Sequence, residues 1–148
     1  KYGEEMNKTD IVGTWVLVSF TAETSDSKKF APWGENPCGQ IIYTDDGNMS
    51  VILTRKGRDK FAIPDPLGGT LEEIKQAFED MDAYAGTYEI NSKEKYITHH
   101  AAISRFPNWE GNNLIRYYDL KDDILTLKTP PMLVDGEEWV ISVVWRRK

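Results

Sequence analysis

The chain has 148 residues, 40% of them hydrophobic and 28% charged, and carries a formal net charge of -6. This length fits one domain with a sizeable core rather than two, and the acidic balance argues against nucleic acid as a partner. The single cysteine, Cys38, excludes an internal disulfide, and no apolar run reaches the length of a transmembrane span.

Residues 1–10 are polar and lack the apolar stretch that a signal peptide requires. We expect them to form a flexible N-terminal segment, in which Lys1–Glu5 are a tag remnant, followed by a single domain over residues 11–148. The cytoplasm is the expected location, and a secreted form whose signal peptide has been removed is the alternative.

The stretch Ile11–Phe20 consists almost wholly of residues that favour β-strands. Its apolar side chains fall on both faces, with Trp15 on one face and Phe20 on the other. This pattern predicts a strand that is covered on both sides. The stretch Trp139–Arg146 near the C-terminus has the same character, and pairing of these two strands would close the sheet and remove its exposed edges.

Between these two strands, turn residues and short apolar patterns predict a series of hairpins. The predicted strands are Gly39–Thr44, Met49–Arg55, Ala83–Ile90, Lys95–Ser104, Asn113–Leu120 and Ile124–Lys128. Apolar residues spaced by three and four predict one helix over Thr70–Met81, with Thr70 as its N-cap. Together these elements predict an all-β fold, an up-and-down antiparallel barrel of about eight strands that can hold one ligand.

Alternation along each strand predicts which side chains point into this barrel. Asp119 and Lys121 belong on the outside of their strand, which turns Arg116 inward. On the neighbouring strand the more apolar face turns His99 inward and His100 outward. The residues that we expect to bind a ligand are Tyr43, Leu53, Tyr88, His99, Trp109 and Arg116.

Two features of this interior leave alternatives open. An inward Arg116 is costly to bury unless an anion pairs with it. The anion is either a ligand carboxylate or phenolate, or a buried acid such as Glu89 or Glu35. Trp33 and Trp109 lie in two proline-containing loops, where they are either lids over the mouth of the barrel or structural plugs of its end.

The two histidines set limits on the chemistry of the site. His99 is a candidate general acid or base together with Tyr84 or Tyr88, but we assign no catalytic residue. His99 and His100 point to opposite faces of one strand, and the chain has only these two histidines. That arrangement argues against a metal site, and we expect no cofactor.

Several short pieces follow one another along the chain and together resemble one family. They are Val12–Ser19, Pro32–Pro37, Tyr43–Ser50, Ala83–Tyr88, the pair His99 and His100, Phe106–Gly111 and Leu125–Pro131. In this order they are similar to the lipocalin-like domain family, small stand-alone bacterial and fungal proteins. The resemblance extends over roughly Ile11–Arg147 and implies a lipocalin-type β-barrel. It also implies that Gly13-Thr-Trp15 on the first strand packs under a cation from the last strand, either Arg146 or Arg147.

Two functions are compatible with such a barrel. The first is binding of a small hydrophobic or amphipathic organic molecule in the cavity. The alternative is a cofactor-independent isomerase or cyclase that acts on a polyketide- or terpenoid-like substrate. Binding is the preferred hypothesis because the sequence does not supply a complete catalytic constellation. The expected partner is therefore a small molecule, bound by a monomer or a homodimer.

Overall fold

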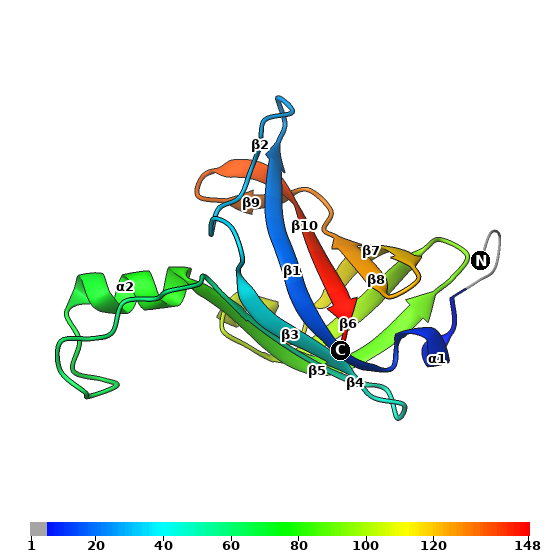
Figure 1. The fold of residues 1–148 in the computed structure, drawn as a ribbon, viewed down its shortest axis with the longest axis horizontal. Helices are drawn as coiled ribbons and strands as arrows, with labels where there is room; N and C mark the ends of the chain where they lie inside the picture. The colour runs from blue at the N-terminus through cyan, green and yellow to red at the C-terminus, as the bar shows by residue number, and fades with distance from the viewer. Residues whose placement is uncertain (1–5) are drawn as a thin grey trace.

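The computed structural model describes residues 6–148, and in it eight antiparallel strands close into a barrel (Figure 1). The barrel strands are β1 (Gly13–Thr24), β3 (Cys38–Tyr43), β4 (Asn48–Thr54), β5 (Met81–Asn91), β6 (Tyr96–Ser104), β7 (Asn113–Lys121), β8 (Ile124–Lys128) and β10 (Glu137–Arg147). Each strand pairs with the next of this series, and β1 pairs with β10 to close the ring. The predicted all-β barrel and the pairing of its first and last strands are confirmed.

Two short strands extend the sheet beyond the barrel. β2 (Lys29–Phe30) pairs with β1, and β9 (Met132–Val134) pairs with β10. Neither was predicted, because a strand of two or three residues contains no alternating pattern that a sequence could reveal.

The seam between β1 and β10 contains a bulge that the sequence did not predict. The register shifts between Leu17 and Ser19, so Val18 has no direct partner on β10. An extra residue reverses the alternation of side chains beyond it. Phe20 therefore lies on the same inner side as Trp15, and the prediction that they occupy opposite faces is wrong. Val18 is 38% exposed, so β1 is not covered on both sides.

The chain enters the barrel through a short helix, α1 (Lys8–Ile11). Asn7 caps it, and Asp10 completes a capping box by accepting a hydrogen bond from the backbone of Asn7. Ile11 is fully buried at the end of this helix rather than at the start of a strand. Lys1–Glu5, where we expected a tag remnant, lie outside the described residues.

The predicted helix is confirmed as α2 (Leu71–Glu79), and it projects to one side of the barrel (Figure 1). Thr70 accepts a hydrogen bond from the backbone of Glu73, whose carboxylate accepts one from the backbone of Thr70. Within residues 6–148 it is the only helix of seven residues or more. A single 3-10 turn, η1 (Pro107–Trp109), follows β6. None of the helices in residues 6–148 has the length and apolar character needed to span a membrane.

Large side chains fill much of the barrel interior. The largest that are fully buried are Trp15, Trp145, Tyr43, Ile11, Ile41, Ile97, Leu125 and His99. The β5–β6 pairing is so close at Gly86 that a Cβ there would lie 1.8 Å from the carbonyl oxygen of His100. The register also shifts between Ala85 and Gly86, so a glycine is needed where the two backbones approach each other.

Candidate functional site

A cavity of about 70 Å3 lies inside the barrel and is partly open to solvent. Its walls are mainly apolar and include Phe20, Leu53, Leu127, Val143 and Trp145. The polar residues that line it are Asp82, Tyr84, His99, Arg116 and Thr129. A mostly apolar cavity with a few convergent polar groups is the usual form of a small-molecule site.

The cavity brings together some of the predicted ligand-binding residues but not all of them. Those that line it are Leu53, His99, Trp109 and Arg116. Tyr43 is buried beside His99, and its hydroxyl is hydrogen-bonded to the imidazole of His99. Tyr88 packs edge-on against Tyr43, with 4.8 Å between ring centroids, and donates its hydroxyl to the carbonyl of Thr44 at 2.7 Å. A ligand-binding role for all six residues stays a prediction.

His99 is held between two tyrosines that come from different strands. The Tyr43 hydroxyl on β3 lies 2.6 Å from Nε2, and the Tyr84 hydroxyl on β5 lies 2.7 Å from Nδ1. His99 itself is 0% exposed. Of the two tyrosines that we considered as its partners, Tyr84 and Tyr88, the structure brings Tyr84 to the imidazole.

The direction of these two hydrogen bonds follows from burial. Burial lowers the pKa of His99 well below its ordinary value, and the positive charge of Arg116 lowers it further. The imidazole is therefore neutral, with one donor and one acceptor nitrogen. Within residues 6–148 the buried Tyr43 hydroxyl has no other hydrogen-bond partner, so we assign the Tyr43 hydroxyl as the donor to Nε2. With this assignment the Nδ1–H donates to Tyr84, and the proton of the Tyr84 hydroxyl is free to point into the cavity.

Both phenols remain protonated at neutral pH. Burial raises the pKa of Tyr43 well above its ordinary value and also raises that of Tyr84, where the nearby Arg116 acts in the opposite direction. The Tyr84 hydroxyl thus offers the cavity a hydrogen-bond donor that does not ionise.

Arg116 lies half-buried in the cavity wall without an acid partner. Its Nη1 donates to the carbonyl of Ile115 at 2.9 Å, and its guanidinium carbon lies 6.0 Å from the centroid of the Trp109 ring. No ion pair to Arg116 occurs among residues 6–148. Glu35 and Glu89 are both exposed, so the hypothesis that one of them neutralises Arg116 from within is wrong.

One acidic residue, Asp82, belongs to the cavity wall, although the sequence pattern did not single it out. It lines the cavity and lies 3.6 Å from Nε of Arg105 in an ion pair. Burial raises the pKa of Asp82, while the charges of Arg105 and Arg116 act in the opposite direction. A signal was available, because Asp82 lies two residues before Tyr84 and thus on the same face of β5.

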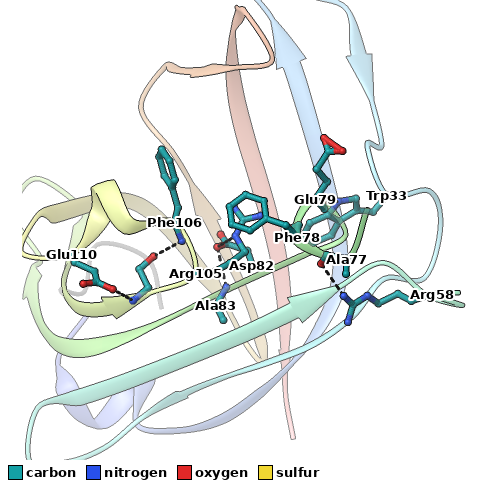
Figure 2. A network of polar contacts seen from close by, with 11 residues as sticks. Trp33, Arg58, Ala77, Phe78, Glu79, Asp82, Ala83, Arg105, Phe106 and Glu110 are labelled. Carbon is teal, nitrogen blue, oxygen red and sulfur yellow. Dashed lines mark hydrogen bonds and ion pairs between the residues drawn. The ribbon is translucent and has the colours of Figure 1, made fainter. Parts of the chain in front are cut away.

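Arg105 also connects the cavity wall to helix α2 (Figure 2). Its Nη1 donates to the carbonyl of Phe78 at 2.5 Å, and its guanidinium lies 4.2 Å from the centroid of the Phe78 ring. Trp33 makes a second connection: its indole donates to the carbonyl of Glu79, and its ring stacks on Phe20 at 4.4 Å. Trp33 thus packs behind a cavity wall, whereas Trp109 is part of one.

His100 points outward, as predicted, and contributes nothing to the cavity. Its Nδ1 lies 2.5 Å from the side-chain oxygen of Asn113, and its Nε2 lies 3.6 Å from the carboxylate of Glu89. In the part of the chain that the structure describes, no three His, Cys, Asp or Glu side chains are grouped so that they could hold a metal ion.

A comparison with known families agrees with this architecture. A family model described as a lipocalin-like domain matches residues 12–148, which include every barrel strand and every residue of the cavity. No curated protein matches the chain.

Proposed function

The chain belongs to the lipocalin-like domain family, and from this membership we propose that it binds a small hydrophobic or amphipathic organic molecule in its barrel cavity. The proposed ligand places its apolar body against Leu53, Trp109 and the other apolar walls. Its polar end is an anion or a carbonyl oxygen that accepts hydrogen bonds from Arg116 and Tyr84.

The observation that carries this proposal is an excess of donors in the cavity. Arg116 has no carboxylate partner among residues 6–148, and the Tyr84 proton is directed at the cavity by the hydrogen bonds of His99. The buried indole N–H of Trp145, another lining residue, also lacks a hydrogen-bond partner in that part of the chain. An unsatisfied buried donor such as the Trp145 indole is costly, and a ligand that brings acceptor atoms would satisfy it and pair with Arg116.

The size of the cavity limits the ligand. Pockets for drug-sized molecules usually measure about 300–1,000 Å3, whereas this one measures about 70 Å3. We therefore expect it to hold a small molecule, or the polar end of a longer one whose remainder leaves through the open side.

Benzoate and benzyl alcohol make a suitable pair of probes, because they share a ring and differ in the charge of the polar end. We expect Arg116→Leu to abolish benzoate binding in ligand-observed NMR and to leave benzyl alcohol binding and the fold unchanged. Arg146→Leu, which removes an exposed arginine of the last strand, is the control and should bind both probes. Unchanged benzoate affinity in Arg116→Leu would contradict the proposal.

A second candidate function, a cofactor-independent isomerase, is favoured by the presence of Asp82 in the same cavity as Tyr84. A carboxylate with a raised pKa is a better base, and a hydroxyl donor beside an arginine can stabilise an enolate. Asp82 would remove a proton from the carbon next to a carbonyl and return it to another carbon. This step is redox-neutral and needs no cofactor. A polyketide- or terpenoid-like substrate with a carbonyl group could undergo it.

Proton exchange into a simple ketone tests this candidate separately from binding. We would follow deuterium incorporation next to the carbonyl of cyclohexanone in D2O by NMR. Asp82→Asn and Tyr84→Phe should each reduce the enzyme-dependent rate by about 10²-fold or more. Tyr117→Phe removes an exposed tyrosine that does not line the cavity and is the matched control. If bound cyclohexanone exchanges no faster than in buffer, the proposed role of Asp82 as a base is wrong.

A further inference from the structure

Helix α2 presents an apolar face that is covered only in part, where Arg105 lies against the ring of Phe78. None of its residues is buried. Leu71, Ile74 and Phe78, which are 88%, 43% and 44% exposed, recur at the three-to-four spacing that places them on one face. The preceding loop adds Ile63 and Leu67, which are 60% and 91% exposed. An isolated helix of this length is marginal in water, so a packing partner for this face is expected.

The helix is nevertheless held firmly at its C-terminal end. Three donors from separate segments bind its last carbonyls: Arg58 binds that of Ala77 at 2.9 Å, Arg105 that of Phe78 and Trp33 that of Glu79 (Figure 2). These bonds satisfy carbonyls that a helix end otherwise leaves free. We call residues 55–80 the arm. The arm projects beside the barrel (Figure 1), and the three bonds at the end of α2 hold the helix in a fixed direction.

Charge is distributed unevenly along the arm. The outer end of the helix carries Glu72 and Glu73 in its first turn. The end near the barrel carries Lys56 and Arg58 of the compact basic cluster, and Arg58 is fixed beside Ala77 by its hydrogen bond. The same end also carries Glu79 and Asp80, which are paired with Lys75 and Arg55. Arg58 at this end and Glu72 at the outer end can therefore pair between two arms only when the arms run in opposite directions.

We propose that the arm is a dimerisation surface, on which α2 packs antiparallel against α2 of a second copy of this chain. A two-fold axis near Ile74 brings Leu71 of each copy onto Phe78 of the other. The same register brings Arg58, at Ala77, close to Glu72 of the second copy. A parallel arrangement would instead set Glu72 against Glu72, and the acidic outer end makes an anionic membrane surface an unfavourable partner.

The contact is self-complementary and closes on itself, as two-fold interfaces do. Two helices of about two and a half turns each bury less area than the roughly 1,600 Å2 of a standard stable interface. We therefore expect a reversible dimer whose dissociation constant lies in the micromolar range, to which Ile63 and Leu67 contribute. This surface is separate from the cavity, so the inference does not depend on the proposed ligand.

Sedimentation velocity of the full chain over a series of concentrations tests the proposal. The double variant Leu71→Lys/Ile74→Lys should weaken the dimer by about tenfold or more, with an unchanged circular dichroism spectrum. Leu133→Lys replaces an equally exposed leucine (77%) of β9, outside the arm, and should leave the dimer unchanged. A chain that stays monomeric into the millimolar range, or a dimer that the double variant does not weaken, would overturn the proposal.

Charge reversal tests the direction of the pairing. Glu72→Arg alone and Arg58→Glu alone should each weaken the dimer. Combined in one chain they should restore it, because each copy then supplies both reversed charges to the other. Arg58→Glu also removes the bond to Ala77, but loss of that bond cannot explain a restored dimer. If the combined variant dimerises no better than the single variants, the antiparallel pairing is wrong.

Discussion

The guanidinium carbon of Arg147 lies 4.3 Å from the centroid of the Trp15 ring. The two residues are directly opposite each other in the pairing of β10 with β1. Arg147 also donates from Nη1 to the carbonyl of Val12 at 3.0 Å and from Nη2 to the carbonyl of Asp10. A single side chain therefore closes the barrel over Trp15, one of its two fully buried tryptophans, and holds the end of helix α1. It is Arg147, not Arg146, that fills the role implied by the family resemblance.

Replacement of Arg147 by methionine should destabilise the protein by about 1–3 kcal/mol. The variant keeps an apolar side chain over Trp15 but loses a cation–π contact and charge-assisted hydrogen bonds to two carbonyls. Arg146→Met is the control, because Arg146 is exposed and its loss should change the free energy of unfolding by less than about 0.5 kcal/mol. Urea denaturation measures both, and equal effects of the two changes would contradict this account.

Gly86→Ala should be among the most destabilising small changes in the barrel. The added methyl would lie 1.8 Å from the backbone oxygen of His100, and backbone cannot rotate away as a side chain can. We expect a loss of about 3 kcal/mol or more, above the usual range for overpacking. Gly111→Ala is the comparison: its methyl meets nothing within 4 Å and only the φ of +80° is strained, a cost of about 1–3 kcal/mol. Thermal unfolding of the two variants should rank them in this order.

The barrel was predictable because its first and last strands are unusually rich in β-branched and aromatic residues. Hairpin turns also mark the boundaries between the other strands. The bulge at Val18 was not predictable, since it depends on how β1 registers with β10 and not on residues of β1 alone. That one residue reversed the expected position of Phe20, which became part of the cavity wall.

The site was predictable only in part, for a similar reason. Alternation correctly turned His99 and Arg116 inward. It could not distinguish an inward side chain that faces the cavity from one that fills the barrel, as Tyr43 does behind His99. It also missed Asp82, because a charged side chain is rarely interior unless it is paired. The partner of Asp82 is Arg105, and the sequence does not reveal that the two residues meet.

The hydrogen bonds of His99 predict an observable tautomer. If the Tyr43 hydroxyl donates its hydrogen bond to Nε2, the ring proton of His99 lies on Nδ1. The ¹⁵N chemical shifts of a histidine-labelled sample distinguish the two nitrogens, and we expect Nδ1 to be the protonated one. Tyr43→Phe removes the donor to Nε2 and should shift that nitrogen, whereas Tyr88→Phe should not. A proton on Nε2 would mean that Tyr84 donates to His99 and not to the cavity.

Keeping His99 neutral should make the stability of the protein depend on pH. Burial holds the pKa of His99 well below its ordinary value of 6.5 in the folded state, whereas the unfolded chain binds a proton near pH 6.5. Below that pH the unfolded state holds more protons than the folded state, so the free energy of unfolding falls as the pH falls.

The size of this effect for one proton is about 1.4 kcal/mol per pH unit, from about pH 6.5 down to the folded pKa of His99. Asp82 has a raised pKa and opposes the trend at low pH, so the measurement should be a difference between two proteins. His99→Gln cannot titrate, and above pH 7 its free energy of unfolding should differ from that of the natural chain by a constant. Below pH 6.5 the natural chain should lose stability faster than the variant in urea titrations. Parallel curves across this range would show that His99 takes up its proton as readily in the folded protein as in the unfolded chain.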